Sequence, residues 1–344
     1  MLLSGPIGLD SVYYKDLGTS AFPSYNLYVD RKRNRVIKFT VGDGNNVSLG
    51  FNVVLALYDL NAENEDKIIY DKTLYTNEYR GLVNQHYYDE ELGIIYAQVQ
   101  VADSITGVTH STGFSGQLCK LEIDFDNVSN TTIELIVDND VETSIGGFTT
   151  IFYASEIDQV YYFANSAGLY KRSMVDGSTL ESFTGLGVNG NTRFRTIAFD
   201  KKKEIYYAAV GEYQPTNKFY KVDFKNSTLF IGANTAPTFA ISPAARIIND
   251  NLFEIYTILN DGTLNRILYD FDLNIISQLP VGLDGVLTKN GVIVLSKGEL
   301  FILQLFRYFR KVVEIQTDKT IPLLSGSIVS GDQSNKSVIL QNDL

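Results

Sequence analysis

Apolar and polar residues alternate along most of the chain in short runs, and polar turns separate these runs. A period of two is typical of β-strands with one buried face. One unit recurs: an apolar strand with a polar end, a polar turn, and a second strand such as Val160-Tyr161-Tyr162 or Ile205-Tyr206-Tyr207. The first strands of the copies end at Asp30, Asp89, Ser155, Asp200, Asn249 and Lys289. The pattern predicts an all-β, repetitive chain.

A second pair of strands follows each first pair, as in residues 169–172 and 219–224, and a polar turn then leads to a last strand such as 228–231. Four short strands per unit, joined by polar turns, predict the blades of a β-propeller. The copies are 59, 66, 45, 49 and 40 residues apart. At about 49 residues per blade, the chain accommodates about seven blades. We therefore predict a seven-bladed β-propeller of four-stranded blades, with residues 1–344 as a single domain.

The two ends of the chain are expected to share the last blade, with strands from residues 11–17 and 328–340. Such a blade would close the ring and remove exposed sheet edges. The alternatives are six blades, or tandem β-sandwiches of about 100 residues each. No Pro, Gly or Ser tract marks a boundary between sandwiches. Residues 300–313 are expected to form strands rather than a basic amphipathic helix, because they align without a gap with the preceding repeat.

The Tyr-Lys-apolar-Asp strands and the Ile-Tyr-Tyr strands resemble the broad β-propeller superfamily over most of the chain. The resemblance implies the fold alone. The chain contains no Trp, and therefore no Trp-Asp dipeptide, and it lacks the paired glycines of kelch repeats. No functional residues of a particular family are carried over to this sequence.

The composition of the chain excludes some classes of binding partner from the expectation and bears on its compartment. The net charge of −11 disfavours binding to nucleic acids and to anionic membranes. No apolar run reaches the length of a membrane-spanning helix, and the first residues do not form a signal peptide. The single cysteine, Cys119, predicts no intrachain disulfide and fits a reducing compartment such as the cytoplasm, while export stays open.

No catalytic residue is predicted. Cys119 lies within an expected strand, where it is interpreted as a small buried side chain. Asp138, Asp140 and Glu142 would share one face of a strand, and hard cations such as calcium bind several oxygen ligands together. A solvated turn is the alternative for this acidic segment, so calcium is the only cofactor considered. On the inner strands we expect four side chains to be buried: Ile95, Tyr161, Ile205 and Ile255.

The first hypothesis for function is a non-enzymatic binding or protein-interaction module. The first two repeats have the longest intervals, with extra residues at 41–52 and 102–117. Long loops on one face of a rigid scaffold often carry ligand contacts. The candidate contacts in these loops are Asp43, Asn45, Thr109, His110 and Phe114. A protein or a carbohydrate is the expected ligand, and the oligomeric state stays open.

The alternative is an enzyme of the hydrolase or lactonase type. Its site would lie at the central channel, with carboxylates from several blades and a calcium ion. Gluconolactonase-like propellers show that such sites can be scattered in the sequence without a local motif. A concave pocket ringed by three or more carboxylates would favour this alternative.

Overall fold

The computed structural model shows a chain made almost entirely of β-strands, with a single 3₁₀ turn at Val128–Asn130 among the described residues. The structure describes residues 26–30, 32–41, 51–59, 68–74, 79–81, 87–101, 117–137, 150–165, 167–186, 194–210, 218–234, 244–258, 264–281, 291–296, 299–304, 307–312, 327–328 and 338–341. In these ranges no helix has the length and apolar character needed to cross a membrane. The all-β prediction is confirmed.

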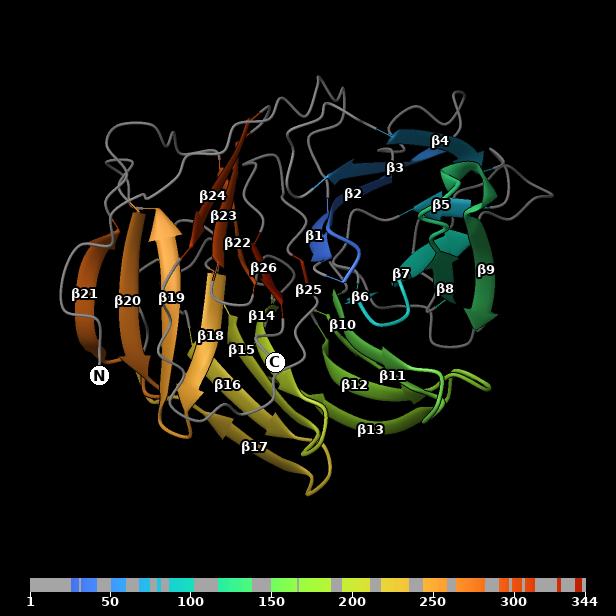
Figure 1. The fold of residues 1–344 in the computed structure, drawn as a ribbon. Helices are drawn as coiled ribbons and strands as arrows, with labels where there is room; N and C mark the ends of the chain where they lie inside the picture. The colour runs from blue at the N-terminus through green and yellow to red at the C-terminus, as the bar shows by residue number, and fades with distance from the viewer. Residues whose placement is uncertain are drawn as a thin grey trace. The chain divides into compact units, whose positions relative to one another are not determined.

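The chain divides into two compact units, one with strands β1–β13 and β25, the other with β14–β24 and β26. In the first unit, two antiparallel sheets have four strands each in chain order (Figure 1). Their strands are β1 (Asn26–Asp30), β2 (Arg35–Val41), β3 (Phe51–Asp59) and β4 (Ile68–Leu74), then β10 (Thr150–Ser155), β11 (Val160–Ala164), β12 (Gly168–Ser173) and β13 (Thr179–Thr184).

A further set of strands in the first unit forms the antiparallel order β6-β7-β8-β9. Its strands are β6 (Tyr87–Asp89), β7 (Ile94–Val101), β8 (Gln117–Glu122) and β9 (Thr132–Val137). Two short strands join it: β5 (Tyr79–Gly81) pairs with β7, and β25 (Ser327–Ile328) pairs with β6.

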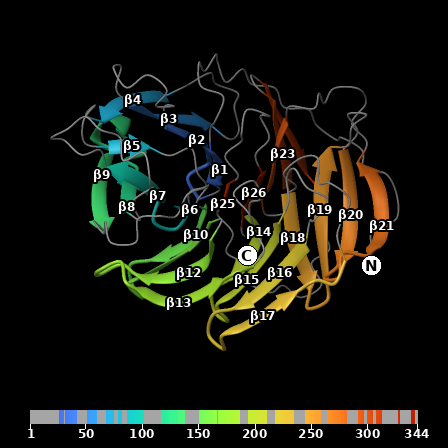
Figure 2. The ribbon, with the colours of Figure 1, turned by 180° about the vertical axis from the view of Figure 1, so that it is seen from behind.

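The second unit repeats the arrangement, with two antiparallel four-stranded sheets in chain order (Figure 2). They consist of β14 (Phe194–Asp200), β15 (Ile205–Val210), β16 (Lys218–Asp223) and β17 (Thr228–Ile231), then β18 (Ala244–Asn249), β19 (Leu252–Ile258), β20 (Leu264–Asp270) and β21 (Ile275–Val281). Four sheets of the chain are thus four-stranded and antiparallel, as the repeated unit predicts.

The last strands of the second unit combine segments that are far apart in sequence. β22 (Gly291–Ser296), β23 (Glu299–Gln304) and β24 (Arg307–Val312) are antiparallel neighbours. β26 (Val338–Gln341) pairs with β22 in parallel. Residues 300–313 therefore contain strands, as predicted. The strand expected from residues 11–17 lies outside the described residues.

A shared turn explains why the first two strands of each repeat form a hairpin. A side-chain oxygen at the end of the first strand accepts a hydrogen bond from a main-chain N–H two or three residues later, which is the Asx or Ser/Thr turn. The accepting side chains, one in each of five repeats, are those of Asp30, Asp89, Ser155, Asp200 and Asn249. In four of them the residue before the second strand has a positive φ: Asn34, Gly93, Gln159 and Glu204. The polar turn in the sequence pattern is therefore a specific hairpin geometry.

Burial agrees with the prediction at three of the four inner-strand positions, and consecutive residues of these strands are buried, as in β11. Ile95, Tyr161 and Ile255 are at most 3% exposed, and Cys119 is buried in β8. Ile205 was expected in the core but is only half-buried, because it is the first residue of β15 and lines an open groove. The alternation predicts which face a side chain occupies, but it does not predict where the neighbouring sheet stops covering that face.

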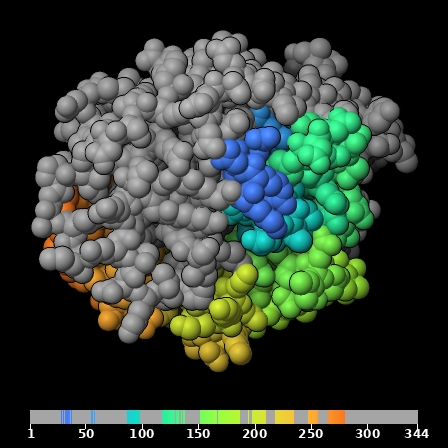
Figure 3. All heavy atoms as spheres, in the orientation of Figure 1, coloured from blue at the N-terminus to red at the C-terminus, as the bar shows by residue number. Residues whose placement is uncertain are grey.

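In the first unit, Arg33 connects the β1–β2 turn to the β6–β7 turn, and Figure 3 shows these two segments in contact at the surface. Its guanidinium donates to the buried carboxylate of Asp30 at 2.9 Å and to the main-chain oxygen of Glu90 at 2.6 Å. It also lies over the Phe125 ring. Tyr88 donates its hydroxyl to Asp30, and burial together with this carboxylate raises the pKa of Tyr88. Arg33 therefore holds two sheets together through polar contacts.

Arg33→Ala is expected to lower the free energy of unfolding by about 1–3 kcal/mol, because it removes a hydrogen-bonded cation from the buried Asp30. Urea denaturation measures the change. Lys32→Ala is the matched control: Lys32 is half-exposed and its partner Glu91 is 83% exposed, so this ion pair contributes little. Equal losses in the two variants would show that Arg33 does not stabilise the turn.

Candidate functional site

The residues that the sequence singled out for binding lie outside the described residues. They are Asp43, Asn45, Thr109, His110 and Phe114 of the two long loops, and Asp138, Asp140 and Glu142 of the acidic segment. Within the part of the chain that the structure describes, no three His, Cys, Asp or Glu side chains are grouped so that they could hold a metal ion. The candidate site comes instead from a groove in the second unit.

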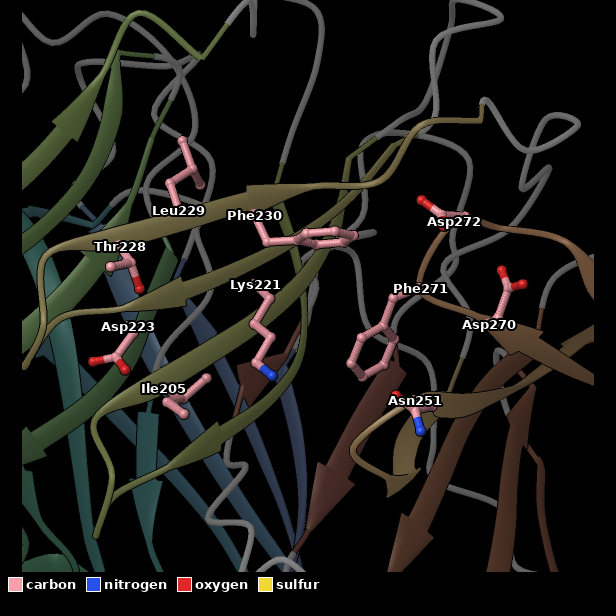
Figure 4. Close-up of a pocket in the computed structure, with 10 residues that line it drawn as sticks. All are labelled: Ile205, Lys221, Asp223, Thr228, Leu229, Phe230, Asn251, Asp270, Phe271 and Asp272. Atoms are coloured by element: carbon pink, nitrogen blue, oxygen red, sulfur yellow. The ribbon is translucent and has the colours of Figure 1, made fainter.

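This groove lies between the face of the β14–β17 sheet and the turn that joins β20 to β21 (Figure 4). It is open to solvent and has a volume of about 640 Å³. We call it the Lys221 groove, after the side chain that projects into it in Figure 4. Its lining residues are Ile205, Lys221, Asp223, Thr228, Leu229, Phe230, Asn251, Asp270, Phe271 and Asp272.

Strand register explains how the β14–β17 sheet supplies its side of the groove. Lys221 of β16 is paired with Tyr207 of β15 and with Phe230 of β17. Asp223 is paired in the same way with Ile205 and Thr228. Directly paired residues, and residues two positions apart on one strand, share a face of the sheet. All of these side chains therefore lie on the face toward β20.

Stacked aromatic rings form the inner end of the groove. Phe271 follows β20 and stacks on Phe219 of β16, with ring centroids 4.4 Å apart and an angle of 11° between the planes. Phe219 stacks in turn on Phe253 of β19, at 4.8 Å. Phe219 and Phe253 are fully buried. These contacts join the β14–β17 sheet to the β18–β21 sheet and position Phe271 at the groove.

Hydrogen bonds beyond the end of β17 fix the β20–β21 turn. The N–H of Ala233 donates to the Asp272 carboxylate at 2.9 Å, and the Asn234 side-chain amide donates to the Asn274 side chain. Gly232 packs so closely that a Cβ atom there would lie 2.3 Å from the carbonyl oxygen of Phe271. The turn is thus held by both polar contacts and close backbone packing.

Carboxylates outnumber the one amine of the groove. Asp223, Asp270 and Asp272 line the groove, and each accepts a hydrogen bond from a main-chain N–H of a turn. The Lys221 amine lies 5.7 Å from the ring centroids of both Tyr207 and Phe271, within the range of a cation–π contact. Burial, and then the charges of Asp200, Asp250 and Asp223, raise the pKa of Tyr207. The groove is therefore a region of negative potential.

The outer wall of the groove is an exposed apolar strand. All four residues of β17 are exposed, with Leu229 at 37%, Phe230 at 42% and Ile231 at 39%. β17 is also the last strand in the order β14-β15-β16-β17. An open groove beside an apolar sheet edge offers both side-chain and main-chain contacts to a ligand.

The sequence predicted the strand at 228–231 but not the groove. One available signal was the dipeptide Asp-Phe after the third strand, which occurs at Asp124-Phe125, Asp223-Phe224 and Asp270-Phe271. Two of these phenylalanines contact a neighbouring sheet: Phe125 lies under Arg33, and Phe271 lies on Phe219. The dipeptide thus marks where successive sheets meet. Comparisons with protein-family models and with curated proteins found no match to the chain.

Proposed function

We propose that this chain is a non-enzymatic binding module whose sheets are the blades of one β-propeller. The first strands of successive sheets lie beside each other: β14 contacts β18, β18 contacts β22, and in the other unit β10 contacts β6 and β7. Blades that surround a common axis bring their first strands together in this way. Seven blades would require a sheet built from both chain ends, whereas the pairing of β26 with β22 supports the alternative of six.

The observation that carries the proposal is the Lys221 groove. It combines an exposed aromatic ring, Phe230, with an amine, carboxylates and the Asn251 side chain, all on rigid strands and fixed turns. Concave surfaces that mix apolar and polar groups are common ligand sites. Asp223, Asp270 and Asp272 line the groove, which is the feature named above for the enzyme alternative. Each of them also accepts a hydrogen bond from a main-chain N–H of a turn, so we assign these carboxylates a structural role rather than a catalytic one.

The test is a screen of the purified protein against peptide and glycan arrays, repeated with Asn251→Trp. Asn251 is exposed at the rim, and the indole would fill part of the groove, while the main-chain N–H that donates to Asn249 is retained. We expect a ligand that the unmodified protein binds saturably and that Asn251→Trp does not bind.

Ile157→Trp is the matched control, because Ile157 is 97% exposed in the corresponding β10–β11 turn and is not a lining residue of the groove. Ligand binding that survives Asn251→Trp would contradict the proposal for the groove. A variant in which short Gly-Ser turns replace residues 42–50 and 102–116, and which leaves β2, β3, β7 and β8 intact, tests the long loops in the same screen. Loss of binding in that variant alone would place the ligand on the loops.

A further inference from the structure

We propose that the Lys221 groove binds an extended, basic peptide segment of a partner protein, which adds a strand to the free edge of β17. The inference rests on the proposed binding function and specifies its partner. Three independent features carry it: the edge, the side chains beside the edge, and the charge of the groove.

The edge of β17 is suited to strand addition. β17 pairs with β16 on one side, and no strand of the described residues pairs with its other side. Sheet edges that must stay unpaired usually carry Lys, Pro or inward-pointing charges. The sequence of β17, Thr-Leu-Phe-Ile, has none of these. The main-chain N–H and C=O groups of this edge can therefore pair with an extended peptide.

Side chains on both faces of β17 would contact alternate residues of an added strand. Thr228 and Phe230 share one face of the sheet, and Leu229 and Ile231 alternate with them on the other, while Leu229 also contributes to the rim of the groove. Neighbouring strands are stabilised by pairs of aromatic and β-branched side chains. Peptide residues opposite Phe230 would thus be apolar or have long aliphatic stems.

Charge selects a basic peptide over an acidic one. The groove presents the carboxylates of Asp223, Asp270 and Asp272 against the single amine of Lys221, and the whole chain has a net charge of −11. The Lys221 amine is engaged in cation–π contacts with the rings of Tyr207 and Phe271. An arginine or lysine on the peptide would complement the groove, whereas an acidic peptide would be repelled.

Fluorescence anisotropy with defined peptides tests this inference. The probe is a labelled short peptide that alternates valine with arginine, and its twin has glutamate in place of arginine. We expect the arginine peptide to bind and the glutamate peptide not to bind, with an affinity that falls as salt is added. Methylation of alternate main-chain nitrogens separates pairing at the edge from side-chain contacts alone. One set of methylated positions should abolish binding and the other set should not, because only alternate N–H groups face β17.

The protein variants keep the hydrogen bonds that the main-chain N–H groups of the turns donate. Asp223→Asn with Asp272→Asn retains acceptor oxygens for the N–H groups of Asn226 and Ala233, so the fold should persist. We expect this double variant to bind the arginine peptide about tenfold more weakly. Asp176→Asn is the control, because Asp176 accepts hydrogen bonds in the β12–β13 turn but does not line the groove.

Each outcome decides the proposal. Equal binding of the two methylated forms, equal binding of the arginine and glutamate peptides, or no binding of either would overturn it. Concentration-dependent dimerisation that Phe230→Lys abolishes would identify a second copy of the chain as the occupant, and would also overturn it. If the arrays yield a glycan that Asn251→Trp fails to bind, the binding function stands and the peptide inference fails. If Asn251→Trp changes neither the binding of the array ligand nor that of the arginine peptide, the groove is not the binding site for either.

Discussion

Arg266→Ala is expected to lower the free energy of unfolding by about 3–5 kcal/mol, the usual cost of removing one partner from a buried ion pair. The Arg266 Nε atom donates to the Glu254 carboxylate at 2.8 Å, and Glu254 is fully buried between the strands of its sheet. Without the guanidinium, the buried carboxylate loses a hydrogen-bonded cation. Urea denaturation followed by circular dichroism measures the loss.

A double variant, Arg266→Leu with Glu254→Leu, separates the charge effect from the loss of packing. Apolar replacement of both partners is often close to neutral, so we expect the double variant to be more stable than Arg266→Ala. Lys203→Ala is the control, because Lys203 is exposed and its amine lies 3.9 Å from Asp200. If Arg266→Ala unfolded at the same urea concentration as Lys203→Ala, the ion pair would not contribute to stability.

Phe219→Ala is expected to cost about 3–5 kcal/mol as well, because large-to-small changes of a buried aromatic leave a cavity. Phe219 is fully buried between Phe253 and Phe271, so its removal weakens the contact between two sheets. The same change at Phe230, which is 42% exposed on the adjacent strand, should cost far less. Thermal and urea unfolding of the two variants give the comparison, and similar losses would contradict the assignment of Phe219 to the core.

The loss of the Phe219 ring should also change the geometry of the Lys221 groove. Phe271 stacks directly on Phe219 and lines the Lys221 groove, so its position depends on that ring. We expect Phe219→Ala to lower the affinity of the groove for any ligand, even at temperatures where the variant is folded. Phe230→Ala would instead lower the affinity for the ligand without a large change in the free energy of unfolding.

The hairpins were accessible from the sequence because their signals are local. An acceptor such as Asp200 and a turn of fixed length lie within a few residues of each other, so the strand boundaries at Asp200 and Ile205 follow from the pattern. Cys119 was likewise placed correctly in a buried strand position. The four-stranded units are confirmed for the same reason, since each strand pairs with the next one along the chain.

The groove and the last strand pairing depend on contacts that are distant in sequence. Parallel pairing of β26 with β22 involves no tight turn, and so it leaves no local signal. Glu254 and Arg266 would be assigned to a solvent-facing position by binary patterning, yet they are buried together. The apolar residues of β17 would be assigned to the core, yet they are exposed because no further strand of the described residues covers that edge.

The close packing at Gly232 limits how sequences of this kind can diverge. A methyl group at this position would collide with the carbonyl oxygen of Phe271, so even alanine would separate the β20–β21 turn from the end of β17. The exposed residues of β17 carry no such restriction. In evolution, the side chains of β17 can therefore change while one neighbouring glycine preserves the alignment of the two sheets.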